Sequence, residues 1–226
     1  MTDQVSHREN PFRASRFRPG LLPFLFSSGE SLKELVDQFR RCDHRAQIVG
    51  PHGSGKSTLL SQLQGRLAAE GYLIRAIKVG PANRSLAYSS ADRPTATGGA
   101  PRVVLDVIDG FEQLPWWQRW RYLFLSRRRE RGILITCHAD CGLPTLWQTQ
   151  TSLPVARHVV NRLTEESAAD YTVSDADLQE LLGRHEGNLR EALFELYDRF
   201  RRDARVDGRE GHREGPEGRE EGAGRQ

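Results

Sequence analysis

The sequence predicts an α/β fold in which a parallel sheet is sandwiched by helices and followed by a small all-helical lid. Two observations carry this prediction. Between residues 31 and 153, short and nearly continuous apolar segments alternate with segments of helical periodicity, as in a parallel sheet covered on both faces. From residue 154 the chain shows helical periodicity only. The 226 residues suffice for one sizeable core and one such small domain.

The elements of the first half follow in order along the chain. A helix begins near Ser31, where apolar residues recur at i, i+3, i+4 and i+7. Segment 45–50 (RAQIVG) predicts a buried strand, 57–70 a helix followed by a capping glycine, and 72–79 (YLIRAIKV) a second strand. Residues 80–101 are rich in Pro, Ser, Thr and Gly, and therefore predict a loop with at most a short helix.

Three further segments complete the predicted sheet. Residues 103–109 (VVLDVID) predict a third strand and 132–137 (GILITC) a fourth, while 146–152 (LWQTQTS) is a candidate fifth. Between the third and fourth strands, a helix opens at Pro115. The α/β domain thus spans residues 31–153.

The two ends of the chain differ from this domain. Residues 1–30 form a loop segment in which Arg, Phe and Pro alternate. Residues 154–202 form the helical lid, with Ser174 as an N-cap and Asn188 and Glu191 as a variant capping box. Residues 203–226 are rich in Gly, Arg and Glu and almost free of apolar residues, so we expect a disordered tail.

Composition narrows the classes of partner and compartment. The tail holds seven acidic residues and five arginines, a charge of −2, so the formal +3 of the chain leaves +5 on residues 1–202. This mildly basic balance is a weak argument for nucleic acid. No apolar segment approaches the roughly 18 residues of a membrane helix. Three cysteines without a secretory signal indicate reduced thiols in the cytoplasm.

The segment between the first strand and the next helix fits the pattern G-x-x-x-x-G-K-[ST]. In such a phosphate loop, glycines let successive backbone N–H groups point at phosphate oxygens beside a positive helix N-terminus. Lys56 should bridge the β- and γ-phosphates, and the Ser57 hydroxyl should ligate Mg²⁺. The cofactors expected here are therefore ATP and Mg²⁺. The candidate binding residues are Gly50, Pro51, His52, Gly53, Ser54, Gly55, Lys56, Ser57 and Thr58.

Two acids on the third strand compete for a place beside the metal ion. Asp109 ends the strand and precedes a glycine, whereas Asp106 lies inside the strand. Side chains alternate along a strand, so residues three apart face opposite ways and only one acid can face the phosphates. We favour Asp109, with Asp106 as a paired structural acid or a sheet-edge residue.

Glu112 is the candidate for orienting the attacking water. It lies just past the end of the third strand, on a loop that can fold back over the site. The alternative is an ordinary solvated acid before a helix.

With these motifs placed, residues 10–200 resemble P-loop ATPases of the AAA+ and STAND group. The resemblance implies that ILITCH contains the sensor-1 side chain, with Thr136 the better match and His138 the second. It implies that GNLREALFELYD belongs to a lid and that its Arg190 reaches back to the phosphates, although a surface arginine is the alternative. It also implies that the N-terminal segment Asn10–Phe12 lies against adenine.

The sequence departs from this group in two respects. AAA+ ATPases usually carry glutamate where this chain has Gly110, and D-G-F-E is closer to the D-G-h-D-E pattern of NACHT-type STAND proteins. No arginine occurs in HADCGLPTLW, where an arginine finger normally lies. Ring assembly and oligomeric state therefore stay open, and we expect a protein partner.

Two other constellations have competing interpretations. Cys42 and His44 precede the first strand while Cys137 ends a parallel one, which places them at opposite ends of the sheet and argues against a shared zinc site. Trp116 and Trp120 lie beside an arginine run and could stack on nucleic acid bases. We favour burial in the core, with Trp117 as the exposed tryptophan.

Taken together, the motifs predict an ATP-binding protein, with two hypotheses for its activity. The first is a Mg²⁺-dependent ATPase in which Asp109, Glu112, Thr136 and Arg190 act on the γ-phosphate. The second is a nucleotide-gated interaction module that hydrolyses ATP slowly or not at all.

Overall fold

The computed structural model of the chain describes residues 10–26, 29–80, 103–128, 131–167 and 171–210, of which 205–210 are described by their backbone alone. The predicted loop 80–101 therefore lies almost wholly outside the described residues. The elements, in chain order, are α1 (Leu32–Arg41), β1 (Arg45–Val49), α2 (Lys56–Ala69), β2 (Leu73–Lys78), β3 (Val104–Asp109), the 3₁₀ helix η2 (Phe111–Gln113), α3 (Trp116–Arg128), β4 (Gly132–Cys137), β5 (Thr145–Gln148), α4 (Leu153–Ser167), α5 (Asp175–Arg184) and α6 (Leu189–Glu210).

A five-stranded parallel sheet forms the centre of the α/β part, as predicted. Its strand order is β2-β3-β4-β1-β5. From β1 the chain crosses through α2 to the far edge, returns strand by strand to β4, and then passes to β5 on the other side of β1. Connections thus leave β1 and β4 in opposite directions, and ligand sites form at such points, beyond the carboxyl ends of the strands.

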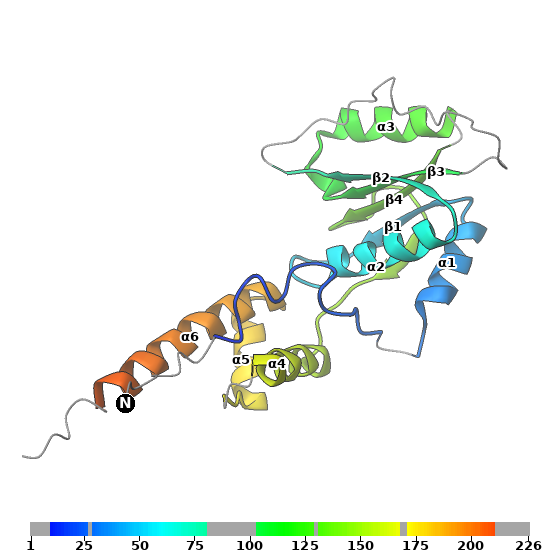
Figure 1. Cartoon of the computed structure of the whole chain (residues 1–226). Helices are drawn as coiled ribbons and strands as arrows, with labels where there is room; N and C mark the ends of the chain where they lie inside the picture. The colour runs from blue at the N-terminus through cyan, green and yellow to red at the C-terminus, as the bar shows by residue number, and fades with distance from the viewer. Residues whose placement is uncertain (1–9, 27–28, 81–102, 129–130, 168–170, 211–226) are drawn as a thin grey trace, which may run out of the picture.

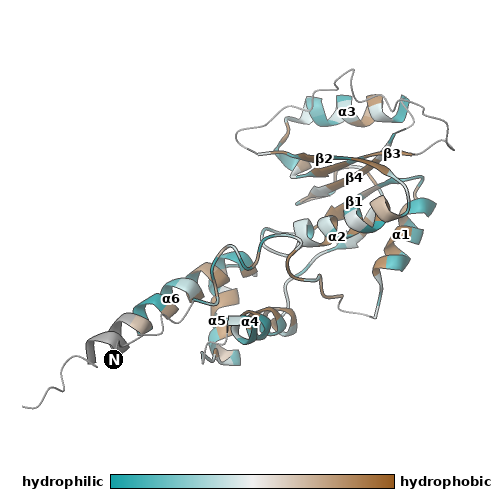
Figure 2. Cartoon of the chain, in the orientation of Figure 1, coloured by the Kyte–Doolittle hydropathy of each residue, from teal (hydrophilic) through white to brown (hydrophobic). Residues whose placement is uncertain are grey.

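Helices cover the two faces of the sheet (Figure 1): α3 lies on one face, and α1 and α2 lie on the other. The leucine stripe of α2 is fully buried against the strands, and Gly71, at φ +93°, follows the end of this helix. Figure 2 shows that the strands are the most hydrophobic part of this layer. Packing on both faces explains why the strands carry nearly continuous apolar residues.

The lid consists of α4, α5 and α6 around a hydrophobic core of their own. Ser174 accepts a hydrogen bond from the Asp177 N–H at 3.1 Å, as predicted for an N-cap. Asn188 accepts one from the Glu191 N–H at 3.3 Å, which is one half of the predicted capping box, while the Asn188 N–H donates to the His185 carbonyl oxygen. No helix among the described residues is long and apolar enough to cross a membrane.

Helix α6 continues past residue 202, where we predicted that the lid ends, and runs to Glu210. The prediction of disorder from residue 203 is therefore wrong for this segment, and residues 211–226 lie outside the described ones. Low apolar content does not prevent a helix that is continuous with a packed one, because its backbone groups bond within the helix. The first glycine after residue 202 is Gly208 and no proline occurs before Pro216, so no strong helix breaker lies directly after the packed part of the helix.

Trp116 and Trp120 of α3 face solvent, so the prediction that they are buried in the core is wrong, whereas Trp117 is exposed as predicted. The opposite face carries the buried residues Tyr122 and Ser126. The Tyr122 hydroxyl donates to Asp106 on β3 at 2.5 Å, and Arg45 of β1 donates to Ser126 at 3.2 Å. These polar contacts orient α3, whereas apolar periodicity identifies a stripe without saying which way it faces. The exposed fractions are 75% for Trp116, 50% for Trp117, 67% for Trp120 and 44% for Phe124.

Candidate functional site

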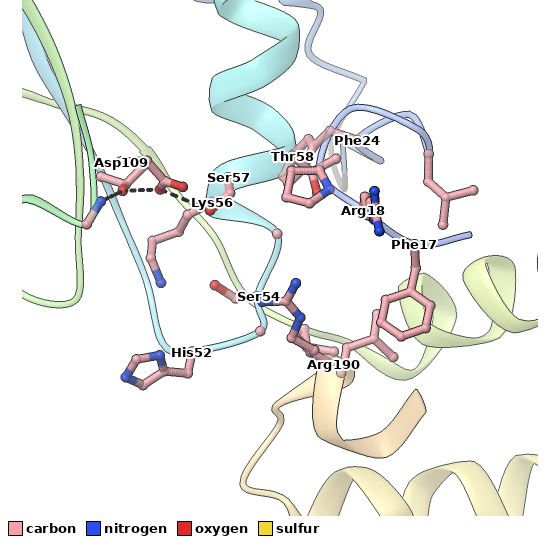
Figure 3. Close-up of a pocket in the computed structure, with 18 of the residues that line it drawn as sticks. Phe17, Arg18, Phe24, His52, Ser54, Lys56, Ser57, Thr58, Asp109 and Arg190 are labelled. Carbon is pink, nitrogen blue, oxygen red and sulfur yellow. Dashed lines mark hydrogen bonds between the residues drawn. The ribbon is translucent and has the colours of Figure 1, made fainter. Parts of the chain in front are cut away.

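A pocket of about 320 Å³ lies at the carboxyl end of the sheet, between the sheet, the N-terminal segment and the lid (Figure 3). This volume falls within the range of small-molecule sites. The predicted phosphate loop lines the pocket with seven of its nine residues, His52 to Thr58. Gly50 and Pro51 contribute backbone carbonyl groups behind it.

The loop adopts a conformation that requires glycine. Gly53 and Gly55 have φ angles of +69° and +92°, in the left-handed region that side chains disfavour. Helix α2 then begins at Lys56 without a side-chain cap. Its first N–H groups lack helical partners, and the positive end of its dipole lies at the pocket. An anion is the ligand that such a terminus favours.

Lys56 supplies a buried cation at the same place. Its side chain is 8% exposed, and its ammonium group donates to the carbonyl oxygens of Gly50 and Pro51, each at 2.6 Å. Burial lowers the pKa of Lys56, while the nearby carboxylates of Glu112 and Asp109 act in the opposite direction. One ammonium group lies beside two carboxylates here, so an added anion would leave an excess of negative charge. A ligand in which the anion is paired with a cation therefore fits this place better than an anion alone.

Asp109 lies at the pocket with two hydroxyl groups directed at one of its oxygens. Ser57 Oγ donates to Asp109 Oδ1 at 3.0 Å, and Thr136 Oγ1 donates to the same atom at 2.7 Å. The Gly110 N–H in turn donates to Thr136 Oγ1 at 2.8 Å. Thr136 therefore orients the carboxylate. Carboxylate and hydroxyl oxygens are ligands that Mg²⁺ prefers, so Ser57 and Asp109 fit such an ion.

Asp106 lies on the other face of β3, as strand alternation requires, and is fully buried. Its carboxylate accepts hydrogen bonds from Arg75 Nε at 2.8 Å, Arg131 Nη2 at 2.7 Å and the Tyr122 hydroxyl at 2.5 Å. Because β3 lies between β2 and β4, Asp106 is a paired structural acid in the sheet interior and not an edge residue.

Gly110 makes the turn that brings Glu112 to the pocket. Its φ is +82°, and a Cβ at this position would lie 2.7 Å from Gln113 Nε2 and 3.0 Å from the Val79 carbonyl oxygen. A glutamate here would be strained and crowded. The chain instead turns into η2, whose middle residue, Glu112, lines the pocket.

The Glu112 carboxylate has one engaged oxygen and one without a partner. Its Oε1 lies 3.3 Å from His138 Nε2. Its Oε2 is the one buried side-chain nitrogen or oxygen atom in the described part of the chain that lacks a hydrogen-bond partner. Leaving such an oxygen unpaired is costly, so it marks a place where a ligand or water belongs. Burial lowers the pKa of His138, Glu112 opposes this, and Lys56 and His52 reinforce it.

The far wall of the pocket is apolar and was not predicted in detail. It combines side chains of the N-terminal segment with others from α4 and α6. Asn10 and Phe12 are not among them, contrary to the implication of the resemblance: Phe12 is buried in the lid core, and Asn10 donates to the Tyr197 carbonyl oxygen at 3.0 Å. The alternation of Arg, Phe and Pro was the available signal for the true lining residues, which include Phe17, Leu22, Phe24, Val155, Val159 and Leu193.

The lid contacts the phosphate loop directly. A Cβ on Gly53 would lie 1.9 Å from Asn188 Oδ1, at the start of α6. Two residues further on, Arg190 lines the pocket, and its guanidinium group points toward the loop near Ser54 (Figure 3). From behind, Thr149 packs against the loop, since its hydroxyl lies 2.6 Å from Ser54 Oγ. No motif identified Thr149 in advance.

The cysteines lie at the two ends of the sheet. Cys42 follows α1 three residues before β1, and Cys137 ends the parallel strand β4 at the opposite end, as the sequence predicts. A hydrogen bond from the Cys137 thiol lowers the pKa of Cys141 to about 7, and Arg119 acts in the same direction.

The pocket thus combines a loop and helix N-terminus suited to an anion, an oxygen pair suited to Mg²⁺, an unpaired carboxylate oxygen and an apolar wall. Comparison of the chain with protein-family models gave no match, and neither did comparison with curated proteins.

Proposed function

We propose that this chain binds ATP with Mg²⁺ and hydrolyses it, in the manner of the P-loop ATPases that its motifs resemble. The observation that carries the proposal is the unpaired Oε2 of Glu112, buried in the pocket that Lys56 and Asp109 also line. This oxygen is an acceptor placed for the proton of a water molecule, which hydrolysis requires and phosphate binding alone does not.

Each residue has a role that follows from its contacts. ATP with Mg²⁺ would supply the transferable phosphoryl group and the divalent charge that offsets its developing negative charge. Lys56 and the start of α2 would neutralise the phosphates, and Ser57 and Asp109 would hold the metal ion.

The proton of the attacking water would pass to Glu112. Its Oε2 is free to accept that proton, while its Oε1 lies 3.3 Å from His138 Nε2. Thr136 contributes by keeping the Asp109 carboxylate oriented. Arg190 approaches from the lid, and its cationic group would stabilise charge on the γ-phosphate.

A second candidate function is the nucleotide-gated module. The observation that favours it is the contact between Gly53 and Asn188, which joins the phosphate loop to the lid. Phosphates entering the loop would be sensed by the lid whether or not they are cleaved.

One set of variants separates the two functions. We would measure binding of a fluorescent ATP analogue with Mg²⁺ and release of phosphate from ATP for the wild type, Lys56→Ala and Glu112→Gln. Lys56→Ala should lose binding. Glu112→Gln should retain binding and lose about 10²- to 10⁴-fold in turnover, the typical contribution of a general base. The exposed acid Glu165 offers a matched control, and Glu165→Gln should change neither quantity.

The outcomes discriminate clearly. Unchanged turnover in Glu112→Gln would refute the catalytic role of this carboxylate. Binding without turnover in the wild type would favour the gated module. Absence of ATP binding by the wild type in the presence of Mg²⁺ would overturn both functions.

A further inference from the structure

The outward face of α3 carries large aromatic side chains that the fold does not use. Trp116, Trp120 and Phe124 follow one another at four-residue spacing, with Trp117 beside them, and all four are exposed. The Trp120 and Phe124 rings are nearly parallel, at 5° and with centroids 5.6 Å apart. Exposed aromatic residues gathered on one helix face mark an interaction surface more often than an accident of folding.

The charges on the same helix have one sign. Helix α3 contains Arg119, Arg121, Arg127 and Arg128, and no aspartate or glutamate. Arg121, Arg127 and Arg128 are exposed, and the guanidinium group of Arg128 lies 4.6 Å from the centroid of the Phe124 ring. The surface therefore combines flat aromatic groups with cations, and its charge is complementary to an anionic partner.

We propose that this aromatic and cationic face of α3 binds single-stranded nucleic acid. Exposed tryptophans stack on bases of any sequence, and arginines pair with the phosphates between them. The geometry suits a strand along the helix, since residues four apart are separated by about 6 Å along the axis. That separation is close to twice the roughly 3.4 Å rise per base, so a ring can lie between neighbouring bases.

Single strands fit this face better than a duplex. In a duplex the flat surfaces of the bases are already stacked on each other and are closed to a tryptophan ring, whereas an unpaired strand presents them. The position of the site also makes it independent of the nucleotide pocket. Helix α3 lies over one face of the sheet (Figure 1), whereas the residues that line the pocket lie at the carboxyl end of the strands, in the N-terminal segment and in the lid.

The test is titration of fluorescein-labelled single-stranded dT20 and rU20, and of a 20-base-pair duplex, into the full chain without nucleotide. We expect binding of a single strand with quenching of tryptophan fluorescence, and weaker binding of the duplex. The affinities for dT20 and rU20, compared with each other, show whether the face prefers single-stranded DNA or RNA. Trp116→Ala/Trp120→Ala should weaken binding at least about 25-fold, because it removes two base stacks and each contributes at least about fivefold.

Matched variants separate stacking and charge from general damage. Leu21→Ala removes an exposed apolar side chain elsewhere and should leave binding unchanged. Arg127→Ala/Arg128→Ala should reduce the salt dependence of the binding constant by a logarithmic slope of about 1.4, if each arginine meets one phosphate. The control is Arg201→Ala/Arg202→Ala on α6, which should leave the salt dependence of the binding constant unchanged. Lys56→Ala should bind the strands as the wild type does.

Four results would overturn the proposal. The first is that the wild type binds neither single strand, and the second is that Trp116→Ala/Trp120→Ala binds them equally well while its circular dichroism matches that of the wild type. The third is that the duplex, or polyglutamate as a non-nucleic polyanion, binds more tightly than both single strands. The fourth is a dimer, seen by sedimentation, that the tryptophan variant abolishes, since a second copy would then occupy the face.

Discussion

Replacing Asp106 by asparagine should destabilise the fold, whereas the same replacement at Asp109 should mainly weaken binding of ATP with Mg²⁺. The two acids are three residues apart on β3 but have opposite surroundings. Asp106 is fully buried, and two guanidinium groups and the Tyr122 hydroxyl donate to it. The Asp106→Asn replacement would keep the volume of the side chain but remove the negative charge that these donors face.

The size of the effect follows from this burial. Removing one partner of a buried ion pair costs about 3–5 kcal/mol in the free energy of unfolding. In a chain of this size each kcal/mol lowers the thermal midpoint by about 2–4 °C, so we expect a fall of about 6–20 °C for Asp106→Asn. Asp109 lies at the end of the strand and is partly exposed. Asparagine at this position should cost about 1 kcal/mol or less, because its amide oxygen can still accept from Ser57 and Thr136 and only the charge near Lys56 is lost.

The assay pairs urea and thermal unfolding with nucleotide binding at a temperature where every variant is folded. Asp37→Asn serves as the matched control: its carboxylate makes a surface ion pair with Arg40 at 3.1 Å, so the variant should unfold within about 1 kcal/mol of the wild type and bind nucleotide unchanged. The reasoning would be refuted if Asp106→Asn unfolded within about 1 kcal/mol of the wild type. Equal loss of Mg²⁺-dependent binding in both variants would also refute it.

Three further predictions concern single groups. The Cys137 thiol lowers the pKa of Cys141 to about 7. The rate at which iodoacetamide alkylates Cys141 should therefore rise with pH and reach a plateau near pH 8. A rate that still rises steeply above pH 9 would contradict this. The pKa of Glu195 is lowered to about 2, first by His185, so its contribution to stability is present above about pH 4.5 and lost as pH falls toward 2. The difference in unfolding free energy between the wild type and Glu195→Gln should shrink over that interval, and a difference independent of pH would disprove the role. Gly110→Ala should destabilise the protein by about 1–2 kcal/mol in urea unfolding, because φ is +82° there, and a neutral result would argue against this backbone conformation.

Features set by local chemistry were predictable from the sequence. The phosphate loop is one contiguous segment whose glycines determine its own backbone, so its residues and their place between β1 and α2 followed from spacing. The caps at Ser174 and Asn188 depend on atoms three residues apart and were predicted for the same reason. Segment 132–137 was also predicted with its bounds, because a continuous apolar segment between turns has few alternatives.

Features set by contacts between residues far apart in the sequence were not predictable from it. The direction in which α3 faces depends on bonds from Tyr122 and Ser126 to residues of other strands. Thr136 was expected to sense phosphate, but its hydroxyl proton is directed at Asp109, an arrangement that depends on the distance between two strand ends. Thr149 reaches the phosphate loop from 95 positions away in sequence, and no pattern along the chain encodes that contact.

Helix α6 gives the contact between Asn188 and Gly53 a mechanical consequence. The helix starts directly after Asn188 and extends for 22 residues, which corresponds to about 33 Å. Its first turn therefore lies beside the predicted phosphate loop, and its last turn lies about 33 Å away. A tilt of about 5° at the first turn would displace the far end by about 3 Å. On the proposed function, a phosphate that shifted the loop enough to tilt this turn would produce a larger movement at the distal end of the lid.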